Sequence, residues 1–111
     1  MCEVNNLATF QLQLLSRTID ETQYPFTKLV IERNITEEEY DELFQLLGRI
    51  EEQYLEQKEE GLLNFSSLLV CFAGMLNEKL EPTETVMALK DEGYFPLLLE
   101  EFIKLINEGK L

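Results

Sequence analysis

The residues whose types could form a reactive site lie in one short segment, VCFAGMLNEKL, at positions 70–80. Cys71 lies within an uncharged run, and Asn77, Glu78 and Lys79 follow it. A thiol beside an amide and an ion pair could form a reactive site. However, a reactive thiol needs a nearby cation to stabilise its thiolate, and the run around Cys71 has none. We therefore interpret Cys71 as a buried, inert thiol in a helix.

Few kinds of catalysis are compatible with the rest of the sequence. The chain has no histidine, which excludes histidine-dependent triads and dyads and disfavours zinc enzymes. Glycine-rich nucleotide-binding motifs and EF-hand spacing are also absent. Cys2 and Cys71 are too far apart in sequence to form a recognisable metal motif. We expect no catalytic residue, no cofactor and no metal site, and hence no enzyme.

The chain is strongly acidic, with 22 Asp and Glu against 9 Lys and Arg and a net charge of -13. Such a surface repels phosphates and anionic lipids, so we expect neither nucleic acid nor membrane as a partner. Glu52, Glu56 and Glu60 follow one another at i,i+4 spacing, where like charges destabilise a helix by a few tenths of a kcal/mol. These three residues, the acidic face, are a candidate surface for a basic protein.

Length and cysteine usage indicate one intracellular domain. The 111 residues are close to the commonest domain size, and we treat 1–111 as a single helical domain. Two distant cysteines favour a reducing cytoplasm. The N-terminal residues lack the pattern of a signal peptide, and no apolar run is long enough to span a bilayer.

Apolar residues recur every three or four positions, which predicts helices and no sheet. We expect an all-α, compact bundle of five to six helices, with one long, central, hairpin-like helix. Thr36 and Glu39 form a capping box at the start of that helix, and Gly61 ends it. The expected ranges are 3–20, 24–34, 37–60, 65–80, 82–93 and 96–109.

The first predicted helix is apolar over an unusually wide arc. A terminal helix has only one obvious side to bury, so we expect its outer side to contact another copy of the chain, as an oligomerisation arm over about 3–20. The alternative is that the helix passes through the middle of its own fold. The candidate interface residues are Val4, Leu7, Leu12, Leu14, Leu15 and Ile19.

The predicted helix at 65–80 is apolar on two sides, so we expect it to be central. Its second side carries the small residues Ser67, Cys71 and Gly74. Small side chains allow another helix backbone to come close, and a close contact would offset the cost of glycine in a helix. Gly48 raises the same possibility in the preceding helix.

Several motifs give the chain a family resemblance. They include Tyr24-Pro25-Phe26, the block FAGMLNEKL at 72–80, Glu84-Thr85 and Gly93. With these motifs the chain resembles the YhaI-like small proteins of Gram-positive spore-forming bacteria, a family of uncharacterised function. The resemblance implies an all-helical, self-associating domain and supplies no reaction, substrate or cofactor.

Three functions follow as hypotheses. The first is a non-enzymatic interaction or structural module that forms a homo-oligomer and contacts other proteins. The second is an acidic regulator that binds a basic or DNA-binding protein as a nucleic-acid mimic. The third is a small-molecule binder with an inter-helix pocket formed by Tyr24, Asn77, Glu78 and Tyr94.

Overall fold

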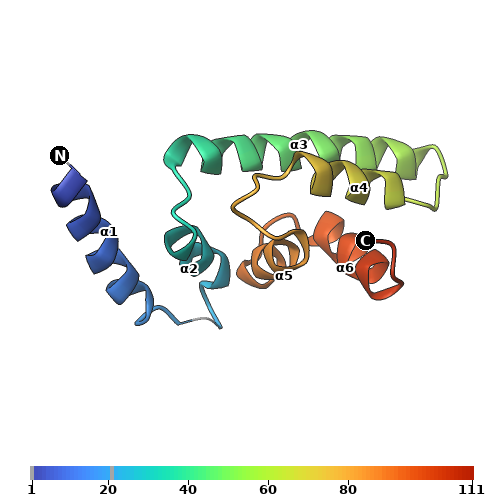
Figure 1. The fold of residues 1–111 in the computed structure, drawn as a ribbon. Coiled ribbons are helices and arrows are strands. Elements are labelled where there is room, and N and C mark those ends of the chain that lie inside the picture. Colours follow the sequence, from blue (N-terminus) through green and yellow to red (C-terminus); the bar gives the residue numbers. More distant parts are fainter. Residues whose placement is uncertain (1, 21) are drawn as a thin grey trace.

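The computed structural model describes the backbone of residues 2–20 and 22–111 and the side chains of residues 7–20 and 22–111. Over these residues the chain forms six helices and no strand, which confirms the predicted all-α bundle (Figure 1). The helices are α1 (Cys2–Ser16), α2 (Pro25–Glu32), α3 (Glu37–Glu59), α4 (Ser66–Met75), α5 (Pro82–Glu92) and α6 (Pro96–Asn107).

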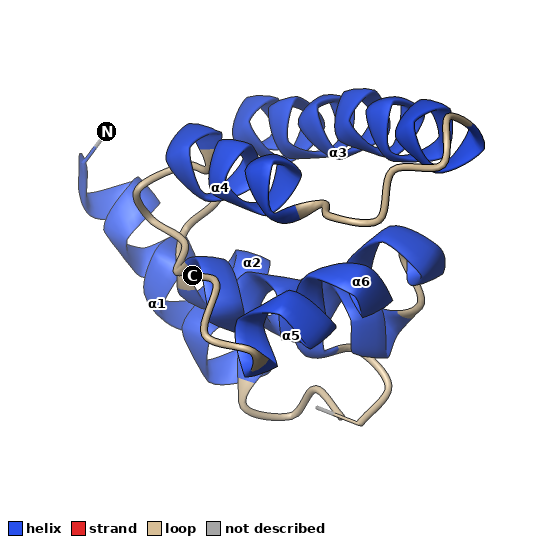
Figure 2. Cartoon of the chain, turned by 90° about the vertical axis from the view of Figure 1, so that its right-hand side faces the viewer, coloured by secondary structure: helices blue, strands red, loops and turns tan. Residues whose placement is uncertain are grey.

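The helices α2 to α6 form two layers. The hairpin of α3 and α4 makes one layer, and α2, α5 and α6 make the other (Figure 2). Aromatic side chains join the layers. The ring centroids of Phe72 in α4 and Phe102 in α6 lie 5.7 Å apart, and those of Phe26 in α2 and Phe44 in α3 lie 5.9 Å apart. The long helix α3 therefore forms one layer together with α4 and buries five side chains in the core.

The boundaries of α3 follow from its capping residues. Thr36 Oγ1 accepts a hydrogen bond from the backbone N–H of Glu39, and Glu39 accepts one from the N–H of Thr36. This is the predicted capping box, which satisfies two of the free N–H groups at the helix start. Gly61 follows the helix with φ of 85°, a left-handed conformation that glycine adopts without strain. The buried stripe of α3 consists of Leu43, Leu46, Leu47, Ile50 and Tyr54.

The first helix gives the molecule an extended shape. The helix ends at Ser16, earlier than the expected Asp20, and α2 is the helix against which it packs. In Figure 1 it lies beside the two-layer body rather than within it. The radius of gyration is 15.8 Å, whereas a compact domain of this length has about 13 Å. The alternative in which this helix passes through the middle of its own fold is therefore wrong.

The fourth helix is shorter and less central than expected. It ends at Met75, and Leu76 is extended with ψ of 142°. Ser67, Cys71 and Gly74 are exposed, so the expected buried thiol is an exposed one. A Cβ atom added at Gly74 would meet no described atom within 4 Å, apart from its own helix backbone and its chain neighbours.

Gly48 gives the same result in α3, where an added Cβ would also meet nothing within 4 Å among the described residues. The prediction that Ser67, Cys71, Gly74 and Gly48 allow a close helix crossing inside the fold is therefore wrong. The periodicity correctly showed that α4 has two uncharged sides. Only the side containing Leu68, Leu69 and Phe72 faces the core.

Candidate functional site

The first helix buries polar residues and exposes apolar ones. Ser16 is 1% exposed, and Thr9 on the same side of the helix is half-buried. Ser16 Oγ donates a hydrogen bond to the carbonyl of Gln13 at 2.7 Å, so its buried hydroxyl is satisfied without a partner on another helix. The large apolar side chains of the helix, which we call the α1 outer face, cover a wide arc and consist of Leu7, Phe10, Leu12, Leu14 and Leu15, all exposed.

The exposures on the α1 outer face are large for apolar side chains. Leu7 and Phe10 are each 56% exposed, and Leu15 is 60% exposed. A surface helix of a monomeric protein normally turns its leucines toward the core and its polar residues toward water. The helix α1 does the reverse, so its sequence suits a surface that another molecule covers.

Two of the six candidate interface residues differ from the others. Ile19 lies beyond the end of α1 and is half-buried. The side chain of Val4 lies outside the described residues. The structure therefore exposes Leu7, Leu12, Leu14 and Leu15 of the predicted set, and it adds Phe10.

The outer side of α4 is a second exposed surface without charge. Val70 is 56% and Met75 is 59% exposed, and the small residues Ser67, Cys71 and Gly74 lie beside them. The Sγ of Cys71 lies 3.7 Å from the Sδ of Met75. No charged residue occurs anywhere in Ser66–Met75.

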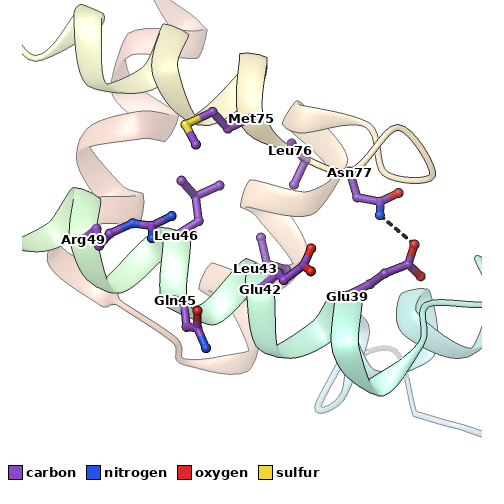
Figure 3. A pocket seen from close by; sticks show the side chains of 9 residues that line it. All are labelled: Glu39, Glu42, Leu43, Gln45, Leu46, Arg49, Met75, Leu76 and Asn77. Carbon is purple, nitrogen blue, oxygen red and sulfur yellow. Dashed lines mark hydrogen bonds between the residues drawn. The ribbon is translucent and has the colours of Figure 1, made fainter.

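Met75 also borders a groove between α3 and the end of α4 (Figure 3). The groove has a volume of about 310 Å³, at the small end of the range for ligand sites. Its lining combines apolar side chains with a polar rim, and we call it the α3–α4 groove. The lining residues are Glu39, Glu42, Leu43, Gln45, Leu46, Arg49, Met75, Leu76 and Asn77.

One end of the groove is fixed by hydrogen bonds to Glu39. Asn77 Nδ2 donates to Glu39 Oε2 at 2.8 Å, and Lys79 Nζ donates to Glu39 Oε1 at 2.8 Å (Figure 3 shows the Asn77 bond). Lys79 Nζ also donates to the carbonyl of Asn34 at 3.0 Å. The bonds from Lys79, Thr36 and Asn77 lower the pKa of Glu39 from 4.5 to about 2. Asn77 and Lys79 therefore hold the segment after α4 against the start of α3.

Glu81 caps the start of α5, because its carboxylate accepts hydrogen bonds from the N–H groups of Thr83 at 3.1 Å and Glu84 at 2.6 Å. Asn77 Oδ1 accepts a hydrogen bond from the N–H of Lys79 at 2.8 Å, within the segment that follows α4.

The four predicted pocket residues do not share the groove. Asn77 lines it, whereas Tyr24, Glu78 and Tyr94 are not among its lining residues. The ring of Tyr94 packs against the ring of Phe44, with 5.0 Å between their centroids, within the aromatic cluster that joins the two layers. Burial, followed by a hydrogen bond with Tyr40, raises the pKa of Tyr94 to about 12. The prediction that these four residues form one pocket is wrong.

The acidic face is exposed as its spacing predicted. Glu52 and Glu56 of α3 and Glu60, the residue that follows this helix, are all exposed. The described ion pairs join Arg33 to Glu84 and Lys79 to Glu39 and do not include these three. In the part of the chain that the structure describes, no three acidic or cysteine side chains come together in a way that could hold a metal ion.

Two functional features were missed in the sequence. The polar residues Thr9 and Ser16 lie seven positions apart, a signal that could have identified the side of α1 that faces the fold. The groove had no comparable signal, because Leu46 and Met75 are 29 positions apart and only the tertiary structure brings them together.

The comparison with known families agrees with this description. A family model described as "Protein of unknown function (DUF1878)" matches residues 3–107. The chain therefore belongs to this family, as the expectation of an uncharacterised domain family required. Among the described residues, no helix has the length and apolar character needed to cross a membrane.

Proposed function

We propose that this member of the DUF1878 family is a non-enzymatic helical interaction module that assembles with further copies of itself through the α1 outer face. The observation that carries the proposal is the reversed burial of α1, which turns Ser16 inward and five large apolar side chains outward. Covering such side chains is favourable, at about 25 cal/mol per Å² of apolar surface removed from water.

The distribution of charge favours a second copy as the partner. Two chains with a net charge of -13 repel each other wherever their acidic surfaces meet. The stretch 7–16 of α1 has no charged residue, and Glu3 is the only one in Cys2–Ser16. Self-association at α1 therefore brings the chains together where the repulsion is weakest. A basic partner would gain little from this neutral surface.

The mass of the protein in solution tests the proposal. Sedimentation at micromolar concentration is expected to give a dimer or a larger species for the wild type. Leu14→Gln combined with Leu15→Gln should shift the species to the monomer, because both side chains lie on the α1 outer face. Helix content by circular dichroism shows whether the variant remains folded.

Leu97→Gln is the matched control, because Leu97 of α6 is 58% exposed and lies outside α1. This variant should sediment as the wild type does. A clean wild-type monomer at micromolar concentration would refute the proposal. Moderate salt should strengthen the assembly, since it screens the repulsion between acidic chains.

The acidic face supports a second candidate function, binding of a basic protein such as a DNA-binding protein. The supporting observation is that Glu52, Glu56 and Glu60, in the second half of α3 and just after its end, are all exposed. Binding of this kind weakens as salt rises, opposite to the expected behaviour of self-association. Replacing all three residues with Gln should abolish capture of a basic partner and leave the oligomer intact.

The cellular setting is part of the proposal. The resemblance of the block FAGMLNEKL at 72–80 and its flanking residues to YhaI-like proteins supports a bacterial origin in a Gram-positive spore former. The presence of only two, widely separated cysteines supports the cytoplasm. Export of a fluorescent fusion from bacterial cells would contradict this assignment.

A further inference from the structure

We infer that the α3–α4 groove is the receiving site for α1 of a second copy, with the phenyl ring of Phe10 inserted between Leu46 and Met75. The inference rests on the proposed self-association and adds the surface that receives the arm. The relevant groups are an exposed aromatic side chain on one helix and a groove of about 310 Å³, with both apolar and polar lining, between two others.

Phe10 is suited to be the anchor of a helix that docks into a groove. The other phenylalanines of the chain are buried or half-buried, whereas Phe10 is 56% exposed. Leu7, Phe10 and Leu14 have the i, i+3, i+7 spacing by which a helix presents anchors to a groove. Large aromatic residues in pockets also dominate the energetics of many interfaces.

The groove offers matching contacts. Leu43 and Leu46 of α3 form its apolar side, and Met75 and Leu76 line it from the end of α4 (Figure 3). A thioether packs favourably against the edge of an aromatic ring. Arg49 at the rim is a cation within the same lining, where it can lie over a ring face. The site is therefore suited to one aromatic side chain.

The arm of the same chain does not fill this groove. Phe10 is exposed on its own chain, and α1 packs against α2 rather than against the α3–α4 hairpin. A second copy can place its own Phe10 in the groove, because its α1 is not held against α2 of the chain that receives it.

The charge pattern also selects a second copy. Helices α1 and α4 are the two that carry at most one charged residue each, and Met75 joins the groove to the uncharged outer side of α4. Phe10 in the groove would place the rest of α1 near Val70 and Cys71. The stretch 7–16 of α1 and the outer side of α4 that would then meet carry no charged residue in a chain of net charge -13, although Glu39, Glu42 and Arg49 line the groove itself.

A charge-swap experiment tests the pairing. Phe10→Lys and Met75→Glu should each raise the apparent dissociation constant of the assembly at least about tenfold. An equimolar mixture of the two variants should recover association. In a mixed dimer with reciprocal docking, one contact pairs the introduced lysine with the introduced glutamate and the other is native. Leu97→Glu and Leu97→Lys are matched controls that should associate as the wild type does.

Each outcome separates this inference from the proposed function. A monomeric wild type refutes self-association itself. An associated wild type that Phe10→Lys dissociates but Met75→Glu does not refutes the groove as the receiving site. Dissociation by Met75→Glu alone refutes Phe10 as the anchor, and a mixture that fails to recover association refutes their pairing.

Disulfide cross-linking provides a second readout that does not depend on weakening the assembly. In a Cys2→Ser background, Leu7→Cys or Leu14→Cys would be combined with the native Cys71, whose Sγ lies 3.7 Å from Met75 Sδ. At least one of the two should form a covalent dimer on mild oxidation, and Cys71→Ser should abolish it. If neither forms the dimer, the docking geometry is refuted.

Discussion

Lys79 and Glu39 meet at 2.8 Å between Nζ and Oε1, and this contact joins the segment after α4 to the first turn of α3. An exposed ion pair on its own contributes little to stability. Glu39, however, also accepts bonds from the N–H of Thr36 and from the amide of Asn77. One carboxylate therefore completes a helix cap and fixes the end of the α3–α4 groove.

The stability of the protein should depend on the ionisation of Glu39. Its pKa is lowered from 4.5 to about 2 in the folded chain, so the ionised form contributes stability above pH 4.5 that is lost as the pH falls toward 2. The difference in unfolding free energy between the wild type and Glu39→Gln should be largest near neutral pH and should shrink across this window. Urea unfolding at a series of pH values measures it.

The lysine provides the control for this prediction. The hydrogen bond from Lys79 is the largest cause of the lowered pKa of Glu39, so Lys79→Met should move that pKa upward. The acid-induced loss of stability should then be smaller than in the wild type and should be complete at a higher pH. A wild-type and Glu39→Gln difference that stays constant from neutral pH to pH 2 would contradict the assigned network.

The buried hydroxyl of Thr85 should contribute no stability. Thr85 is fully buried in α5, and its Oγ1 has no hydrogen-bond partner among the described residues. An unpaired buried hydroxyl costs about 1–3 kcal/mol. Thr85→Val should therefore leave the unfolding free energy unchanged or raise it by about 1 kcal/mol, as measured by chemical denaturation.

Thr85→Ser separates the hydroxyl from the methyl group. It keeps the unpaired oxygen and removes the packed methyl, so it should lower the unfolding free energy by about 1 kcal/mol. If Thr85→Val were the more damaging of the two, the hydroxyl would have a partner and the premise would fail.

Replacing glycine by alanine should change the unfolding free energy in opposite directions at two positions, Gly48 and Gly93. Gly48 lies inside α3, and a Cβ there meets nothing within 4 Å among the described residues. Gly48→Ala should raise the unfolding free energy by about 0.5–1 kcal/mol, because alanine is the better helix former. Gly93 has φ of 97° at the end of α5, so Gly93→Ala should lower it by about 1 kcal/mol or more. Thermal unfolding of both variants tests the contrast.

The exposed position of Gly74 leads to a separate prediction. Because an added Cβ at Gly74 has open space around it, Gly74→Leu should leave the helix content and the cooperativity of unfolding intact. Circular dichroism during thermal unfolding is the measurement. A collapse of the fold would restore the close helix crossing that the sequence suggested and the structure does not contain.

The sequence predicted the helices well because their ends are encoded locally. Thr36 and Glu39 mark the start of α3, Pro25 and Pro82 occupy first turns, and Gly93 ends α5. Such signals depend on residues only a few positions apart.

The covering of each apolar face was harder to predict, because periodicity shows that a side is apolar but not what packs against it. In α4 both sides are apolar, and only the topology decides that Leu69 is buried while Val70 is exposed. The link between Lys79 and Glu39 spans 40 positions for the same reason. Local capping was predictable from sequence, whereas the groove required the assembled hairpin.

The exposed apolar side chains of α1 also have a consequence during protein synthesis. The helix α1 precedes α2 to α6 in the chain, so the ribosome makes it before the two-layer body that follows. Its main intramolecular contact, α2, leaves Leu7, Phe10 and Leu15 in water even when folding is complete. Nascent chains that expose such apolar surface are prone to aggregate. The helix that we propose to carry assembly would therefore expose apolar surface from its synthesis until a second copy covers it.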